Sequence, residues 1–208
     1  ELVDSNGLVP IRLSEKEYVR AHDFRRYLHK NLEDFIIETP HKNPLELLNK
    51  KFDQSQIKTV QEKWKPYNFK DQNIDDFLQN LNIDKTVEIS SINGGYSNAL
   101  KQLNKFIDNG YEDYAKFSSN PSKEASSQLS PYFHSGQIST HEVFEKISNL
   151  ESWTLESIDP KMVGRREGWW GSTENFESFM DELITWRELG YHTCVRRANY
   201  DQYSSLPE

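Results

Sequence analysis

Five consecutive residues in the middle of the chain, Ser126-Ser127-Gln128-Leu129-Ser130, combine three hydroxyl groups with the start of a helix, because Pro131 follows directly. Proline is favoured in the first turn of a helix, where its missing N–H leaves no hydrogen bond unmade. The first N–H groups of a helix are unpaired and carry the positive end of the helix dipole, so with serine hydroxyls they suit an anion, above all a phosphate. The alternative is that Ser127 or Ser130 only caps the helix, as serine commonly does.

A second candidate is the pair Glu182 and Trp186, four positions apart in a segment with helical periodicity. At this spacing the two side chains are neighbours on one side of a helix. Trp186 shares a face with three further apolar residues: Phe176, Phe179 and Leu183. This pattern predicts a carboxylate beside an indole on a largely buried face. Acidic side chains are seldom buried without a partner, so Glu182 needs either a cation such as Arg187 or a ligand.

Other kinds of active site are not favoured. A nucleophilic hydrolase is not indicated, because the chain has no Gly-Xaa-Ser-Xaa-Gly sequence. His134 and His141 have no carboxylates at a spacing that suits a metal, so we expect helix-surface histidines and no metal site. The single cysteine, Cys194, excludes an internal disulfide and a cysteine-based zinc site, and it is compatible with a reducing compartment.

The bulk composition limits the partners. The 208 residues include 33 acidic and 25 basic side chains, a net charge of −8, so non-specific attraction to nucleic acid is not expected. Contact with DNA would need a local basic groove. There is no run of about 18 apolar residues and no signal peptide, which predicts a protein without a membrane span. The chain starts with Glu1 rather than methionine, so we expect it to begin mid-protein.

The first part of the chain has two expected elements. Residues 8–13 predict a short strand, which Pro10 confines to an edge or an end. Ser14 followed by Glu17 predicts a capping box and a helix that runs to about Glu38. The buried stripe of this helix is expected at Phe24, Leu28, Leu32 and Phe35. A solvated face is expected for its basic residues: Arg20, Arg25, Arg26 and Lys30.

The remainder predicts a series of helices. Short helices are expected at 44–51 and 54–63, and Asn73 is expected to cap another at 74–81. A long helix is expected at 97–117, with Tyr114 at the end of its apolar stripe, either in the core or in the wall of a site. Further helices are expected at 139–150 and 173–194. The irregular stretch between them contains Trp169 and Trp170, for which packing is favoured over ligand stacking.

Three segments in this order, 126–139, 179–191 and 200–207, resemble the photolyase/cryptochrome family, and most closely the class II cyclobutane pyrimidine dimer photolyases. The resemblance is densest from about residue 94 to 207. It implies a mainly α fold, the first half of a helical FAD-binding domain of photolyase type, preceded by a short strand and linker from an α/β antenna domain. The implied domains are 1–40, the end of the antenna domain with a connecting helix; 41–93, a linker with short helices; and 94–208, the first part of the FAD-binding catalytic domain.

The resemblance also implies roles for individual residues. The serine turn would hold the pyrophosphate of FAD, and Phe179 would face the flavin. The implied FAD-binding residues are Tyr114, Ser126, Ser127, Leu129, Ser130, Gln137 and Phe179. Glu182 would hydrogen-bond the thymine carbonyls of a DNA lesion, and Trp186 would form an apolar wall beside it. Candidates for phosphate contacts at the rim, which surface solvation explains as well, are Arg165, Arg166, Arg196 and Arg197.

The implied activity is light-dependent DNA repair by a carbon–carbon lyase. Excited, reduced FAD passes an electron to a cyclobutane pyrimidine dimer in UV-damaged DNA, the ring splits, and the electron returns. The lesion would be flipped out of the duplex. We expect a monomer in the cytoplasm, or in the nucleus of a eukaryote. The alternatives are a cryptochrome-like light sensor without repair activity, and a helical interaction module that has lost FAD.

The chain departs from the family pattern at three places. Ser118-Ser119-Asn120-Pro121 stands where the family has Arg-Asn-Asp-Pro, and His134-Ser135-Gly136 stands where it has His-Phe-Gly. The sequence also stops at Glu208, where the family continues into the rest of its flavin domain. We therefore expect either part of a longer protein or a degenerate relative.

Overall fold

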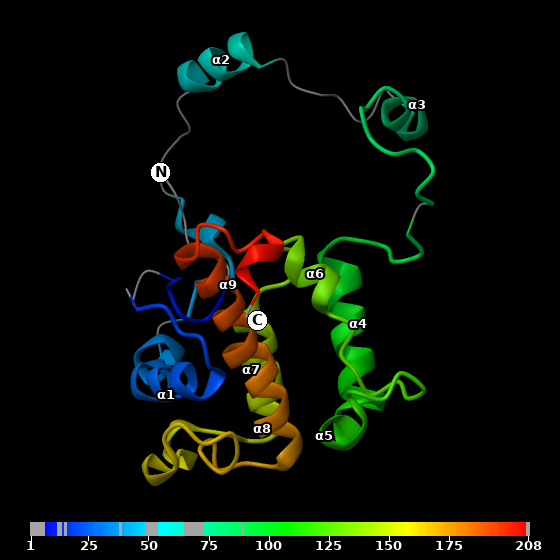
Figure 1. The fold of residues 1–208 in the computed structure, drawn as a ribbon. Coiled ribbons are helices and arrows are strands. Elements are labelled where there is room, and N and C mark those ends of the chain that lie inside the picture. Colours follow the sequence, from blue (N-terminus) through cyan, green and yellow to red (C-terminus); the bar gives the residue numbers. More distant parts are fainter. Residues whose placement is uncertain are drawn as a thin grey trace. The chain divides into compact units, whose positions relative to one another are not determined.

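The computed structural model describes residues 7–11, 14, 16–37, 39–48, 54–64, 73–88 and 90–206. In these ranges the regular secondary structure is helical throughout, in agreement with the predicted mainly α fold (Figure 1). The chain divides into two compact units, one formed by residues 1–40 together with 94–208, and the other by residues 41–93. The antenna, linker and FAD-domain roles of 1–40, 41–93 and 94–208 stay predictions.

The described part of the unit 41–93 contains the short helices η2 (Pro44–Leu47), α2 (Gln54–Lys63) and α3 (Ile74–Gln79). The Asn73 side chain caps α3 by accepting a hydrogen bond from the Asp75 N–H, as its position before the helix predicts. None of the residues of η2 or α3 is buried. All residues of the candidate site lie in the other unit, to which the remaining description refers.

The predicted strand at 8–13 is not found in its described part, residues 8–11. Leu8 and Val9 are buried as their apolar character suggests, but their N–H groups donate to Oε1 of Glu188 at 2.6 and 3.3 Å. A carboxylate side chain from the far end of the sequence thus takes the place of a neighbouring strand. Arg12 and Leu13 lie outside the described residues.

The first long helix, α1 (Ala21–Ile37), starts later than the capping box at Ser14 predicts. Ser14 instead closes a local turn, in which its Oγ accepts a hydrogen bond from the Lys16 N–H. The Ser14 carbonyl oxygen accepts from Nη2 of Arg196 at 2.6 Å. Phe24, Leu28 and Leu32 are buried as predicted, and Phe35 is partly buried. Glu38, the expected last residue, lies outside the described residues.

Arg25 does not belong to a solvated face, contrary to expectation. The residue is only 7% exposed, and its guanidinium donates from Nε and Nη2 to the two carboxylate oxygens of Asp181 at 2.8 and 2.9 Å. A bidentate partner offsets much of the cost of removing an arginine from water. This ion pair joins α1 to the helix that carries Glu182.

The expected helix at 97–117 is divided into α4 (Tyr96–Asn109), η3 (Tyr111–Asp113) and α5 (Tyr114–Phe117). The division falls at Gly110, where the carbonyl oxygen of Glu124 would lie 2.9 Å from an added Cβ. Only glycine allows the 124–125 segment to come this close. The Asn175 side chain then fixes the new direction, since it donates to the Glu112 carbonyl and accepts from the Ala115 N–H.

The next helices are α6 (Ser130–His134) and α7 (Thr140–Leu150), and Ser139 caps α7 through a hydrogen bond from the His141 N–H. Residues 151–172 contain only two short 3₁₀ helices, η4 (Leu155–Ser157) and η5 (Pro160–Met162). Trp169 and Trp170 in this stretch are both buried, which confirms the packing role. Trp170 packs among Trp153, Phe144 and Phe176.

The predicted helix at 173–194 is present but not uniform. It consists of α8 (Glu174–Met180), a π-helical segment η6 (Asp181–Trp186) and α9 (Arg187–Arg196), which follow one another without a gap (Figure 1). A final 3₁₀ turn, η7, covers Tyr203–Ser205. π segments are rare, and they occur frequently at functional sites.

One apolar core holds this unit together. It takes side chains from α1, α4, α7, α8 and η6. Its largest fully buried members include Phe24, Leu28, Leu32, Leu103, Leu129, Ile147, Phe176, Met180 and Ile184. Because α8 and η6 contribute to this core on one side, their opposite side is available to form the wall of a cleft.

The Arg25–Asp181 pair leads to a prediction about stability. Arg25→Met leaves the buried Asp181 carboxylate without its bidentate partner and is expected to lower the free energy of unfolding by about 3–5 kcal/mol. The double variant Arg25→Met/Asp181→Leu removes both charges and should recover most of this loss. Urea denaturation measures both effects, with Lys30→Met on the exposed side of α1 as the control. Equal losses in the single and double variants would contradict the assignment.

Candidate functional site

A cleft of about 670 Å³ opens in the described part of this unit. Its walls come from α5, the serine turn with α6, the loop at Arg166, and the continuous helix α8–η6–α9. Small-molecule sites typically have volumes of roughly 300–1,000 Å³. The cleft is therefore large enough for a ligand of cofactor size.

The cleft brings together most of the residues that the sequence singled out. The predicted residues that line it are Tyr114, Ser126, Ser127, Ser130, Arg166, Phe179, Glu182 and Trp186. Serine hydroxyls and the Glu182 carboxylate thus share one cavity, although more than fifty residues separate them in sequence. This arrangement is the one that a flavin site shared with a lesion pocket requires.

Five predicted residues do not line the cleft. Leu129 is completely buried, so it supports the serine turn through the core. Gln137 accepts a hydrogen bond from the Gly95 N–H at 2.8 Å. Arg165 is exposed. Arg196 binds the Ser14 carbonyl, and Arg197 binds Glu17 and the carbonyl of Ser205. Arg196 and Arg197 therefore bind other parts of the same chain, which the sequence did not reveal. Their contact with DNA stays a prediction.

The serine turn is not used for helix capping. The N-cap residue of α6 is Leu129, and no side chain caps this helix, so the capping alternative for Ser127 and Ser130 is wrong. Ser126 Oγ accepts from the Gln128 side chain at 2.7 Å, and the Gln102 side chain holds the Ser127 carbonyl. Ser130 is the first residue of the helix and is exposed on the cleft.

Gln128 has a φ of 56°, in the left-handed region that side chains other than glycine seldom adopt. Such strain persists where the surrounding structure fixes it, and it occurs frequently at ligand-binding turns. The surroundings here include the hydrogen bonds to Ser126 and Ser127 and the buried Leu129 that follows. The turn therefore presents its hydroxyls in a fixed conformation.

An aromatic group forms the next part of the wall. The rings of Tyr114 and Phe179 meet edge to face, with centroids 5.2 Å apart, and both contact Phe106 behind them. Tyr114 is thus both a core residue and a wall of the cleft. Burial, together with the nearby acids Glu182 and Asp181, raises the pKa of Tyr114 to about 12. Its phenol consequently keeps its proton at neutral pH and can donate a hydrogen bond.

Glu182 and Trp186 face the cleft rather than a buried surface, which corrects the expectation from sequence. Trp186 is 48% exposed, and Glu182 is also exposed. No ion pair to the Glu182 carboxylate is found among the described side chains, and the guanidinium of Arg187 lies over the rings of Phe133 and Tyr191. Arg166, which also lines the cleft, is a cation that acts on Glu182 by lowering the pKa of its carboxyl, and both kinds of partner considered for Glu182, a cation and a ligand, stay predictions.

Partial burial raises the pKa of Glu182, and the adjacent Asp181 acts in the same direction, whereas Arg166 opposes them. The shift favours the protonated carboxyl group. A protonated carboxyl can donate a hydrogen bond to a carbonyl oxygen, while an ionised one can only accept. In its protonated form, Glu182 can thus donate to a carbonyl oxygen in the cleft.

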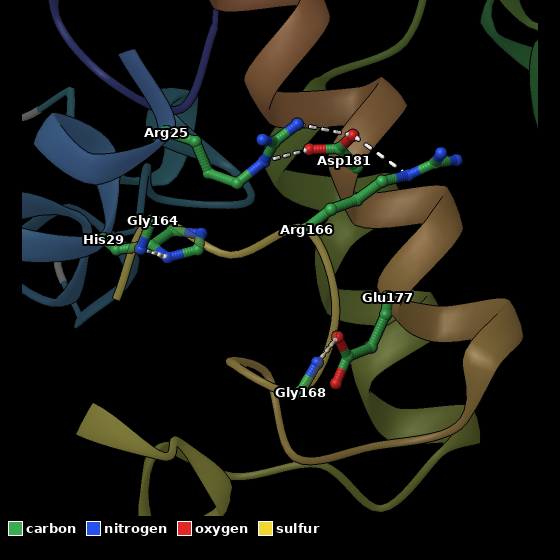
Figure 2. A network of polar contacts seen from close by, with 7 residues as sticks. All are labelled: Arg25, His29, Gly164, Arg166, Gly168, Glu177 and Asp181. Atoms are coloured by element: carbon green, nitrogen blue, oxygen red, sulfur yellow. Dashed lines mark hydrogen bonds and ion pairs between the residues drawn. The ribbon is translucent and has the colours of Figure 1, made fainter. Parts of the chain in front are cut away.

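The first two residues of the π segment are adjacent acids in different surroundings. Asp181 is buried against Arg25, whereas the next residue, Glu182, points to the cleft. Figure 2 shows the Asp181 carboxylate between the guanidinium groups of Arg25 and Arg166. The buried acid therefore fixes the start of the segment from which Glu182 and Trp186 project.

Sequence reasoning did not assign several other residues that line the cleft. They are Ser118, Ser119, Gln128, Phe133 and Arg187. Arg187 directly follows the Trp186 position, and Ser118 and Ser119 lie in a segment that departs from the family pattern. Gln128 lies inside the serine turn. Proximity to the recognised motifs is the signal that could have identified these residues.

In the described ranges, no group of three or more His, Cys, Asp or Glu side chains could hold a metal ion. None of the helices described is long and apolar enough to cross a membrane.

Comparison with known proteins identifies the relatives of this chain. It is 26% identical over 207 residues to the deoxyribodipyrimidine photo-lyase of Methanothermobacter thermautotrophicus, a match that covers 99% of this chain. It is 25% identical over 202 residues to the deoxyribodipyrimidine photo-lyase of Potorous tridactylus, covering 96% of this chain. The chain is similar to proteins of the photolyase/cryptochrome family. A shorter match of 51 residues, 49% identical, relates it to cryptochrome-2 of Arabidopsis thaliana.

The extent of these matches is uneven. The photolyase/cryptochrome relative described here spans 38% and 32% of the length of the two photo-lyases, and the match to the cryptochrome covers 24% of the chain. No family model matches the chain. The comparisons support the family resemblance, while the activity of the whole proteins comes to this chain only as a proposal.

The pKa of Glu182 gives a prediction for stability. A carboxyl whose pKa is raised on folding destabilises the folded state when it is ionised, at pH values above its folded pKa. Glu182→Gln should therefore raise the urea midpoint at pH 7. The gain should shrink as the pH falls towards about 4, the ordinary range of glutamate.

Glu33→Gln is the control, because Glu33 is exposed on α1. It should change the midpoint little at either pH. A Glu182→Gln protein less stable than the wild type at pH 7 would show that the cleft stabilises the carboxylate instead.

Proposed function

We propose that this photolyase/cryptochrome relative is a light-dependent DNA repair flavoprotein that binds FAD in the cleft and acts on cyclobutane pyrimidine dimers. The observation that carries the proposal is the joint lining of one cleft by the serine turn, the Tyr114–Phe179 wall and Glu182 with Trp186. Phosphate-binding hydroxyls, aromatic rings and a hydrogen-bonding acid are the groups that a flavin next to a base lesion requires.

The residues present suit FAD chemically. Ser126, Ser127 and Ser130 offer hydroxyls for the pyrophosphate in a turn of fixed conformation. Phe179 and Tyr114 offer apolar ring surface for the flavin, and the volume of about 670 Å³ suits a ligand of this class. The chemistry that FAD supplies in this proposal is a light-driven electron transfer to the dimer.

The roles of the protein side chains follow from their environment. Glu182, in its protonated form, donates a hydrogen bond to a thymine carbonyl and stabilises the negative charge that develops there. Trp186 offers an exposed indole as an apolar surface beside the bases. Both groups project from the π segment held by Asp181, so they act from a fixed support.

A cryptochrome-like light sensor without repair activity is the second candidate. The match at 49% identity over 51 residues to cryptochrome-2 favours it. Both candidates use a flavin, so absorbance cannot separate them. The presence of Glu182 and Trp186 on the cleft favours repair, because a sensor has no need of a lesion-binding acid.

Cofactor binding gives a direct test of the proposed function. The purified protein should show the visible absorption bands of a flavin, and Ser130→Glu should abolish them. Glutamate is well tolerated in the first turn of a helix, so α6 should persist while the new charge repels a phosphate. Ser122→Glu, on an exposed loop outside the cleft, is the matched control and should retain the flavin. A colourless wild-type protein would instead favour a helical interaction module.

Repair activity gives a further test of the proposed function. Under blue light and a reductant, the flavin-containing protein should restore thymines in an oligonucleotide that carries one cyclobutane dimer. Glu182→Gln should lower this rate by about 10²-fold or less, since an amide still donates a hydrogen bond whereas removal of a stabilising donor costs about 10²–10³-fold. Glu182→Ala should show the larger loss. Bound flavin together with unrepaired dimers would identify the sensor.

A further inference from the structure

Two adjacent arginines, Arg165 and Arg166, differ sharply in their surroundings. Arg165 is exposed and does not line the cleft. Arg166 lines the cleft, and its Nε lies 3.7 Å from Oδ2 of Asp181. Its side chain is 61% exposed, so the rest of the guanidinium is accessible from the cleft. Two residues of identical chemistry therefore offer a natural comparison.

The side chains of His29 and Glu177 hold the loop that carries Arg166 on both sides of it. Two positions before Arg166, the N–H of Gly164 donates to Nδ1 of His29 at 3.1 Å. Two positions after it, the N–H of Gly168 donates to Oε2 of the buried Glu177. Figure 2 shows these two anchors and the Asp181 contact along one stretch of chain.

The His29 anchor is well suited to its role. Its ring stacks on Trp169 with centroids 3.8 Å apart and an angle of 10° between the planes. Burial, and to a lesser extent Arg25, lowers the pKa of His29 to about 3. The ring is therefore neutral at physiological pH, so its Nδ1 lone pair stays available to the Gly164 N–H.

Asp181 does not fully neutralise the charge of Arg166. Both oxygens of that carboxylate already accept hydrogen bonds from Arg25 at 2.8 and 2.9 Å. In the described part of the chain, no hydrogen bond from Arg166 itself is found, and its contact with Asp181 is a longer ion pair. Arg25, Asp181 and Arg166 together carry one positive charge in surplus, and Arg166 is the member that lines the cleft, where its charge also acts on the exposed Glu182.

We propose that Arg166 is a phosphate-binding residue inside the cleft, held ready by Asp181 and by the anchors at Gly164 and Gly168. The guanidinium suits a phosphate because it presents several N–H donors in one plane. The phosphate belongs either to the backbone of a bound nucleic-acid strand or to a nucleotide cofactor. This choice of sources rests on the proposed function, whereas the anion site itself does not.

The test compares Arg166→Gln with Arg165→Gln, which remove the same charge one position apart. Calorimetric titration with inorganic pyrophosphate should show about tenfold weaker binding for Arg166→Gln, because charge-assisted hydrogen bonds are lost. Arg165→Gln should match the wild type, and Arg166→Lys should lie between the two. Unchanged urea midpoints in all variants would exclude a loss of folding as the cause.

Two further measurements distinguish the sources of the phosphate. If the strand supplies it, Arg166→Gln should reduce the slope of log K against log salt for a dimer-containing single strand by about 0.7. If the cofactor supplies it, Arg166→Gln should weaken FAD but leave riboflavin, which has no phosphate, unchanged.

The proposal is overturned if Arg166→Gln binds pyrophosphate as the wild type does, if Arg165→Gln loses as much affinity, or if the wild type does not bind pyrophosphate at all. A wild type that binds pyrophosphate through Arg166 but takes up neither flavin nor damaged DNA would retain the anion site and refute the proposed function. The two failures are therefore distinguishable.

Discussion

The buried ion pair between Arg25 and Asp181 is the constraint on which the rest of the candidate site depends. Asp181 is the first residue of the π segment, and Glu182 and Trp186 project from that segment into the cleft. The same carboxylate lies 3.7 Å from Arg166 on the facing loop. A buried charge is tolerated only when its partners are in place, so one carboxylate links two parts of the wall, the π segment and the Arg166 loop, to α1.

Different walls of the cleft supply different chemical groups, because each wall is built from a different kind of backbone segment. Hydroxyls come from a turn outside regular helix, where the strained Gln128 fixes the backbone. Aromatic surface comes from Tyr114 and Phe179, which line the cleft and also pack in the hydrophobic core. Asn175 ties these two walls together, because it bonds the backbone on both sides of Tyr114 while belonging to the same helix as Phe179.

Periodicity predicted those parts of the fold that one segment determines by itself. The buried positions Phe24, Leu28 and Leu32, the cap at Asn73 and the cap at Ser139 are local properties, and they are confirmed. Arg25 was assigned to the surface because a helical pattern does not reveal an acid 156 positions away. The late start of α1 has a similar cause, since Ser14 binds residues near the other end of the chain.

In the candidate site, too, the sequence predicted the features that one segment determines and missed those that depend on distant contacts or on backbone geometry. Ser126, Ser127, Ser130 and Glu182 were identified from their types and sequence context, and the cleft contains all of them. The π conformation was not predicted, because residues 181–186 have the same apolar pattern as an α-helix. The engagement of Arg196 and Arg197 was also missed, since it depends on Ser14 and Glu17. Charge alone did not separate Arg166 from its neighbour Arg165.

The contacts of the first forty residues have a consequence for the order of folding. Leu8 depends on Glu188, Ser14 on Arg196 and Arg25 on Asp181, over separations of 180, 182 and 156 positions. Contacts between residues so distant in sequence form slowly, because the intervening chain must close into a large loop first. During synthesis the apolar face of α1 would emerge from the ribosome long before its partners, and it would stay exposed to solvent until they follow.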